Sequence, residues 1–342
     1  KLNMPSSLLI LCVVALAHSC SASGALYGMS LVGNQPAVVS LSKMDYTTGN
    51  VTVFPTKFSQ LDGMSDLNAA DENVGIYYYL GDTSAGTTLV GIDMKSGEQA
   101  CSGPIPLREL GYVGVAQSLN YDLKNKHLVL TGLLDNKQNA SHGVLRTKGC
   151  DRGGVATVVH IGTFGDANFV PMLHSSALDS QGQRLYVEVA VSKTSSAIGV
   201  INLNANPASK DFFTVIDEDS SQHSLVGMQW DRTEGNLVGV VGSSAGLFLR
   251  TLKFDQGKAT WNTRAIPPQE YIWLYGNAGD VSALDTAGRF LYVLAGKVPS
   301  GGGDPPMHLV QINLKTGSVS NTPPVSGLPF GTNSLLEMLF VP

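Results

Sequence analysis

Hydrophobic and polar positions along the chain recur as one pattern about every fifty residues. Each copy has a hydrophobic approach, an Asp, a polar turn and a short apolar run, as in SALDSQGQRLYVEVA around Asp179 and SALDTAGRFLYVLAG around Asp285. Weaker copies surround Asp71, Asp122 and Asp231, and successive Asp residues are separated by 51, 57, 52 and 54 positions. Intervals of this size indicate a repeat architecture.

The apolar runs inside each repeat have the length and composition of β-strands. Residues 185–189 (LYVEV) and 291–294 (LYVL) are rich in β-branched and aromatic residues and are bounded by glycine or polar turns. Further strands follow, joined by turns such as 45–49 (DYTTG), 93–97 (DMKSG) and 313–317 (NLKTG). In these turns the Asp or Asn side chain caps the backbone and Gly supplies a positive φ. Each repeat therefore predicts about four antiparallel strands.

Four strands per repeat, with no helical stretch between repeats, predict an all-β chain folded as a β-propeller. The five Asp-centred repeats give five blades, and residues 25–58 supply three strands of another blade that lacks its first strand. Residues 334–341 (SLLEMLFV) provide the missing strand. The sequence thus predicts a six-bladed β-propeller, closed where the C-terminal strand joins the first blade. Seven blades are less favoured, because they require about 45 residues each, fewer than every observed interval.

The N-terminal segment predicts secretion. An apolar run at residues 8–17 is followed by small residues and is too short to span a bilayer, as expected of a cleaved signal peptide over residues 1–24. No later segment approaches eighteen apolar residues, which predicts no transmembrane anchor in the mature chain. Residues 25–342 are therefore expected to form a single secreted, extracellular propeller domain.

Charge and cysteine content narrow the functional classes. The net charge is −5 and no basic cluster is present, which argues against nucleic acid as a partner. Outside the predicted signal peptide, Cys101 and Cys150 are the cysteines, and in an oxidising compartment they predict a disulfide between consecutive blades. Two buried free thiols are the alternative. The sequons at Asn50 and Asn139 lie in predicted turns and predict N-glycosylation.

The recurring Asp residues are interpreted as turn caps, because a residue repeated in every blade performs the same local task. Function is expected where the repeat is broken, at the mouth of the central channel. Positions five or six residues before each Asp, or next to these, carry polar groups suited to a polar ligand or a cation. A water-filled channel is the alternative interpretation. The candidate channel residues are Asp66, Gln117, His174, His223, Asp280 and Asn333.

The segments GQRLYVEVA (182–190), GRFLYVLAG (288–296) and HLVQINLKTGSV (308–319) resemble the broad superfamily of secreted propellers with YVTN-like, NHL-like or gluconolactonase-like repeats. Within it, the six-bladed gluconolactonase, paraoxonase and strictosidine-synthase-like groups hold a channel metal, usually calcium, in a ring of acidic and amide residues. The resemblance implies counterparts of that ring in this chain. They are Asp66, Gln117, Asp280 and Asn333.

Two functions from different classes follow. The first is an extracellular recognition module that binds another protein, a glycan or a small molecule through its faces. The second is a calcium-dependent hydrolase or lactonase with its site at the mouth of the central channel. Binding of a cation by the channel residues would discriminate between them.

Overall fold

The protein is described by a computed structural model. The residues described are 24–34, 37–59, 63–83, 86–134, 141–151, 154–164, 170–190, 196–217, 226–243, 246–255, 258–267, 271–274, 282–297, 306–328 and 338–342. Within these ranges the regular elements are all strands, and no helix is long and apolar enough to cross a membrane. The predicted signal peptide covers residues 1–24, and residues 1–23 lie outside the described part of the chain.

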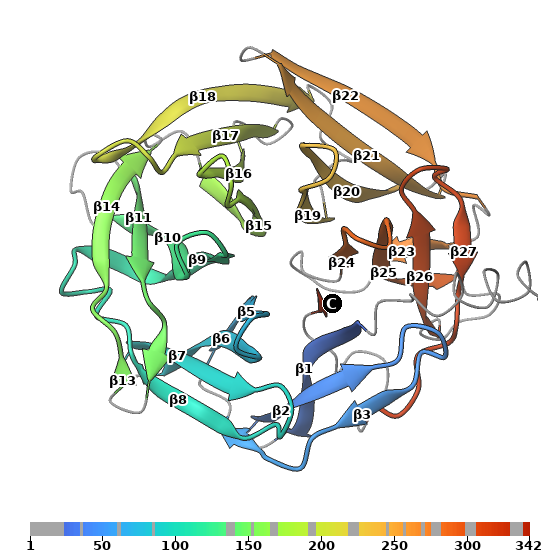
Figure 1. The fold of residues 1–342 in the computed structure, drawn as a ribbon, viewed down its shortest axis with the longest axis horizontal. Coiled ribbons are helices and arrows are strands. Elements are labelled where there is room, and N and C mark those ends of the chain that lie inside the picture. The colour runs from blue at the N-terminus through green and yellow to red at the C-terminus, as the bar shows by residue number, and fades with distance from the viewer. Residues whose placement is uncertain are drawn as a thin grey trace, which may run out of the picture.

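Six blades surround a central channel, and the chain runs round the ring in sequence order (Figure 1). The first three blades consist of the following strands: blade 1, β1 (Ala25–Asn34), β2 (Ala37–Met44), β3 (Val51–Val53), β4 (Phe58–Ser59) and the C-terminal β28 (Leu339–Val341); blade 2, β5 (Gly63–Asp71), β6 (Ile76–Thr83), β7 (Gly86–Asp93) and β8 (Gln99–Pro104); blade 3, β9 (Tyr112–Asp122), β10 (His127–Leu134), β11 (His142–Thr147) and β14 (Val159–Phe164).

The other three blades follow the same plan, with the innermost strand first. Their strands are, for blade 4, β15 (Val170–Asp179), β16 (Arg184–Ala190), β17 (Ser196–Asn202) and β18 (Ala208–Asp217); for blade 5, β19 (Val226–Asp231), β20 (Asn236–Ser243), β21 (Gly246–Asp255) and β22 (Lys258–Ala265); for blade 6, β23 (Tyr271–Leu274), β24 (Ser282–Asp285), β25 (Phe290–Lys297), β26 (Met307–Asn313) and β27 (Val319–Asn321). In blade 6 both β23 and β24 pair with β25.

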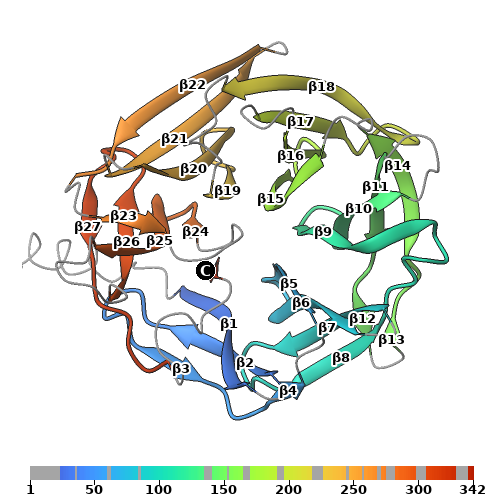
Figure 2. The ribbon, with the colours of Figure 1, turned by 180° about the vertical axis from the view of Figure 1, so that it is seen from behind.

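The ring closes as the sequence predicts. β28 pairs antiparallel with β1, so that Ala25 faces Val341 and Tyr27 faces Leu339. Both views of the ring place this C-terminal strand at the channel beside β1 (Figures 1 and 2). The six-bladed fold and its closure by the C-terminal strand are therefore confirmed.

Blades 3 and 4 share a continuous sheet, which the sequence does not predict. The outer strands β14 and β18 pair in parallel at Gly162↔Ala208 and Thr163↔Ser209, and this joins the two blades into eight strands. The approach is close because Gly162 has no side chain. A Cβ at this position would lie 1.9 Å from the Ala208 carbonyl oxygen.

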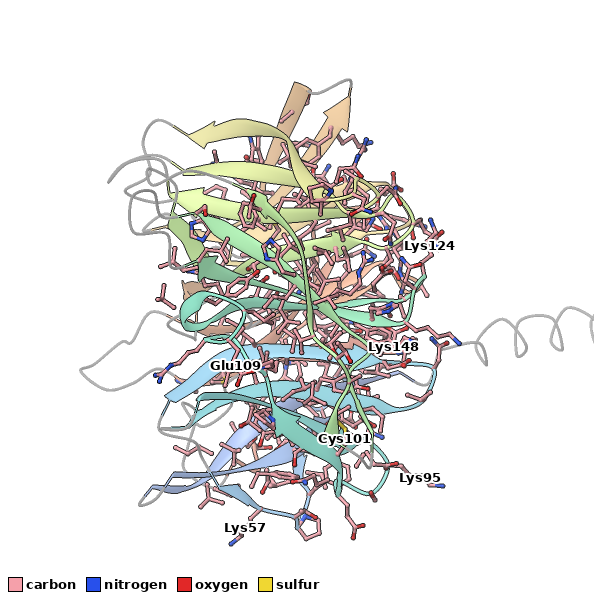
Figure 3. All side chains as sticks on the ribbon, turned by 90° about the vertical axis from the view of Figure 1, so that its left-hand side faces the viewer. Lys57, Lys95, Cys101, Glu109, Lys124 and Lys148 are labelled. Carbon is pink, nitrogen blue, oxygen red and sulfur yellow. A yellow bond between two sulfur atoms is a disulfide. The ribbon has the colours of Figure 1, made fainter. Side chains whose placement is uncertain are left out.

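Blades 2 and 3 are joined by the disulfide between Cys101 and Cys150, whose Cα atoms are 5.6 Å apart (Figure 3). Cys101 lies on β8, the outer strand of blade 2. Cys150 lies on β12 (Cys150–Asp151), which forms a short hairpin with β13 (Gly154–Val155) and contacts β8. The hairpin brings the second cysteine within bonding distance of β8. The predicted disulfide is present, and the alternative of two free thiols is wrong.

The turns between the first and second strands form as predicted. In each of blades 2 to 6 an oxygen of the recurring Asp accepts a backbone N–H two or three residues later. The donors are the N–H groups of Asn73, Lys124, Gln181, Thr233 and Gly288, at 2.7–3.1 Å. The turns at 45–49, 93–97 and 313–317 are capped in the same way by Asp45, Asp93 and Asn313.

Tyrosines on the second strands fill the space between blades. Tyr77, Tyr186 and Tyr292 are almost fully buried, in blades 2, 4 and 6. Each pairs across the sheet with a small residue of the innermost strand, as Tyr292 does with Ala283. The small residues suit the innermost strands, which lie close together around the channel. The tyrosines lie one strand further out, where the space between neighbouring blades is wider.

Candidate functional site

One face of the ring carries the turns that follow the recurring Asp residues, and we call it the turn face. Lys124 lies in such a turn of blade 3, and Lys95 lies in the turn between β7 and β8. Both project from the same side of the ring, whereas Glu109 lies on the opposite side (Figure 3). The two kinds of turn therefore share one face.

Five of the six channel residues proposed from the sequence have side chains outside the described part of the chain. His223, Asp280, Asn333 and the sequon Asn139 lie outside the described residues. The backbones of Asp66 and His174 are in β5 and β15, but their side chains are outside the description.

Gln117 is the one candidate whose side chain is described. It is half-buried on β9, and its Oε1 lies 3.2 Å from Nδ1 of the buried His142 on β11 of the same blade. Both residues belong to blade 3, so the contact of Gln117 with His142 links two strands of the same blade.

A cavity of about 200 Å³ lies among the innermost strands β5, β9, β15, β19, β24 and β28. Its walls come from the last residues of these strands and from the first residue of each following turn. Because those turns define the turn face, the cavity lies at that end of the channel. We call it the channel cavity.

Among the described residues that line the channel cavity, two carry a charge: Glu72 and Arg232. Each directly follows a recurring Asp, Glu72 in blade 2 and Arg232 in blade 5. These two blades lie on opposite sides of the ring, as the positions of β5 and β19 show (Figures 1 and 2). Burial raises the pKa of the Glu72 carboxyl, the positive charge of Arg232 lowers it, and Asp71 raises it further, with a net rise.

The remaining polar groups of the channel cavity are mostly amides and hydroxyls. Asn120 Nδ2 donates to Ser176 Oγ at 2.8 Å, which links blades 3 and 4 across the cavity wall. Gln229 Nε2 donates to the Ser282 carbonyl at 3.4 Å. Asn68 Nδ2 is buried and has no hydrogen-bond acceptor among the described residues. A buried donor without a partner is costly, and such a group is often satisfied by a ligand or water.

The sequence pattern did contain the signal for this cavity. The residue after each recurring Asp is Glu72, Leu123, Ser180, Arg232 or Thr286, so this position varies while the Asp is constant. A search for breaks in the repeat at that position would have found both charges. Within the described residues no group of three or more His, Cys, Asp or Glu is arranged to hold a metal ion.

No protein-family model matches the chain, and no curated protein matches it. Among solved structures, the fold is similar to TolB from Acinetobacter baumannii, with TM-score 0.56 and 11% identity over 100% of this chain and 74% of that one. It is also similar to a candidate 6-phosphogluconolactonase from Bacteroides uniformis, with TM-score 0.51 and 12% identity over 91% and 84% of the two chains. The chain is a β-propeller. At such identities the likeness concerns the fold alone, and function has to be argued from the site.

Proposed function

We propose that this protein is an extracellular binding module that takes a small dipolar ligand, such as a free amino acid, in the channel cavity. The observation that carries the proposal is the pair of opposite charges, Glu72 and Arg232, contributed by opposite blades to one cavity. Pockets of this kind bind through a few polar groups placed around a concave space.

The chemistry of the walls specifies the ligand. A cationic group is attracted to the Glu72 carboxylate and an anionic group to the Arg232 guanidinium. Asn68, Asn120 and Gln229 add polar amide side chains to the wall. Burial disfavours ionised Glu72 in the empty protein, and a ligand cation beside it would offset that penalty. The volume of about 200 Å³ favours a ligand of few atoms over a peptide segment.

Isothermal titration calorimetry of the full chain with the standard amino acids, one at a time, tests this proposal, with glucose as the uncharged control. At least one amino acid should bind. Glu72→Gln and Arg232→Gln should each weaken its binding roughly tenfold or more, because each leaves one ligand charge unpaired.

Glu109→Gln is the matched control, since Glu109 is exposed on the opposite face (Figure 3). It should leave the affinity unchanged. No heat with any amino acid, or equal losses in Glu109→Gln and Glu72→Gln, would overturn the proposal.

The second candidate function is a calcium-dependent hydrolase or lactonase at the same end of the channel. The raised pKa of Glu72 favours it, because a carboxyl titrating closer to neutrality at a cavity serves general acid–base catalysis. The calcium ligands proposed for it are Asp66, Asp280 and Asn333. Thermal melts in EDTA and with calcium restored decide between the functions, since a metal that binds only the native state raises Tm. A calcium-dependent rise would favour the hydrolase, and no rise would favour the binding module.

Secretion and glycosylation are part of the proposal. The disulfide between Cys101 and Cys150 fits an oxidising compartment. Asn50 is exposed, and its Oδ1 accepts a hydrogen bond from Ser326 Oγ at 2.7 Å. The full chain should be expressed in and secreted by eukaryotic cells. Treatment of the secreted protein with a glycosidase that removes N-linked glycans should then reduce its mass. Substitution of both Asn50 and Asn139 by Gln should abolish that reduction.

A further inference from the structure

A second cavity, of about 360 Å³, lies between blades 5 and 6, away from the channel. It is bounded by the turn after Asp231, by β20, β21 and β22 of blade 5, and by the turn between β26 and β27 of blade 6. We call it the blade 5/6 groove. Its volume falls within the range of roughly 300–1,000 Å³ typical of small-molecule sites.

The groove is positively charged although the chain as a whole has net charge −5. Arg289 is neutralised inside it, because its Nη1 lies 2.5 and 2.6 Å from the two oxygens of Asp231 and its Nη2 lies 3.6 Å from Glu234 Oε1. Three further cationic side chains line the groove and form no ion pair with a described acidic side chain: Lys253, Arg264 and Lys315. They come from β21, β22 and a turn of blade 6, so different elements direct positive charge to one space.

Unpartnered buried polar atoms accompany this charge. Asn236 lines the groove with only 5% of its surface exposed, and its Oδ1 has no hydrogen-bond donor among the described residues. Nε of Arg289, whose side chain is 11% exposed, likewise has no acceptor. Native structures rarely leave such atoms unsatisfied, and both atoms belong to residues that line the groove.

The corresponding place between blades 3 and 4 shows what a purely structural arrangement looks like. Gln183 occupies the same turn position as Arg289, with a similar positive φ of 54° against 64°. Both ends of its amide are bonded, with Nε2 donating to Asp122 at 2.9 Å and Oε1 accepting from Asn125 at 2.8 Å. The unsatisfied atom at Arg289 therefore does not follow from the repeat itself.

We propose that the blade 5/6 groove binds a hydroxylated carboxylate, the chemistry of a sugar acid, either free or at the end of an acidic glycan. The carboxylate lies among Lys253, Arg264 and Lys315, and its oxygens accept from cationic donors. Hydroxyls of the ligand contact the polar side chains of Thr251 and Asn262, which also line the groove. This site is separate from the channel cavity and does not depend on the function proposed for it.

Titration of the full chain with D-glucuronate, and with glucose as its uncharged counterpart, tests the inference. Glucuronate should bind and glucose should not, with an affinity that falls as salt is added. The double variant Lys253→Gln/Lys315→Gln removes two exposed charges and should weaken binding about tenfold or more.

The matched control is the double variant Lys95→Gln/Lys124→Gln. Both residues are exposed on the same face, and Lys95 occupies in blade 2 the turn position that Lys315 occupies in blade 6 (Figure 3). This variant and Arg232→Gln should bind glucuronate as the unchanged protein does. Absence of glucuronate binding, equal binding of glucose, or an equal loss in the Lys95/Lys124 control would overturn the inference. A glucuronate-terminated oligosaccharide then shows whether the site accepts a glycan end or the free acid alone.

Discussion

The interface between blades 3 and 4 resembles the interface between blades 5 and 6. In each, a side chain of the later blade binds a buried Asp of the earlier blade, but the chemistry of the contact differs. In the first, Gln183 reaches back to the buried Asp122 through neutral amide hydrogen bonds, and the outer strands β14 and β18 pair directly. In the second, Arg289 reaches back to Asp231, which is only 1% exposed, through a charged pair. Paired outer strands close the first interface, whereas the second contains a cavity.

The recurring Asp has the same structural role in both interfaces, and the side chain that binds it differs. In both interfaces an Asp caps its own turn with one oxygen and receives a side chain of the next blade. A neutral amide completes that arrangement by hydrogen bonds and brings no second charge into the interface. A guanidinium makes its own interface dependent on an ion pair, because a buried charge that loses its partner is strongly destabilising. We therefore expect the two interfaces to respond differently to the same substitution.

The largest effect is expected from Arg289→Gly, which leaves the Asp231 carboxylate buried without its cation. Glycine occupies this left-handed turn position in blades 2 and 5, at Gly75 and Gly235, so the backbone accepts the change. The free energy of unfolding should fall by about 3–5 kcal/mol. Denaturant unfolding measures it. Glu234→Gln is the control, and its loss should stay below about 1 kcal/mol because Glu234 is half exposed.

A smaller effect is expected from Gly162→Ala, which acts on the other interface. The new Cβ would meet the Ala208 carbonyl oxygen, so β14 and β18 must move apart. The loss should be roughly 1–3 kcal/mol, the range for a forced overpacking. Hydrogen exchange should also become faster at the amides of Gly162–Thr163 and Ala208–Ser209. Unchanged exchange at these residues would show that the two blades are not held together by this pairing.

The smallest of these losses is expected from Gln183→Gly. Asp122 keeps its bonds from the Lys124 backbone and from Asn125 Nδ2, and no ion pair is broken. The free energy of unfolding should fall by about 1.5 kcal/mol, the lower end of the range for a hydrogen bond to a charged group, because Asp122 keeps two other donors. If Gln183→Gly proves as damaging as Arg289→Gly, the distinction between the neutral and the charged interface is wrong.

Much of the fold could be predicted because the repeat fixes it locally. The Asp-capped turns, the strands that follow them and the closing strand near Leu339 all follow from residue types and spacing, and the structure confirms them. The parallel pairing of β14 with β18 and the hairpin that carries Cys150 were not predicted. Both depend on contacts between segments of different blades, which no pattern within one repeat specifies.

The site was harder to predict because the innermost strands are irregular. Register shifts occur in β5 between Met64 and Asn68, and in β15 between Pro171 and Ser176. Counting back from the recurring Asp therefore loses the orientation of side chains within a few residues. Glu72 follows an Asp directly, where the turn geometry is constant. Positions adjacent to the Asp are consequently the reliable ones for locating channel residues.

The function proposed for Glu72 implies that this residue serves binding at the expense of stability. Because burial raises its pKa in the folded protein, ionised Glu72 destabilises the fold at neutral pH, and this penalty disappears below its ordinary pKa of 4.5. Thermal melts of the unchanged protein and Glu72→Gln should show a higher Tm for the variant at pH 7, no difference at about pH 3.5, and loss of the ligand-induced rise. A lower Tm at pH 7 with ligand binding intact would contradict the account and make Glu72 a structural residue.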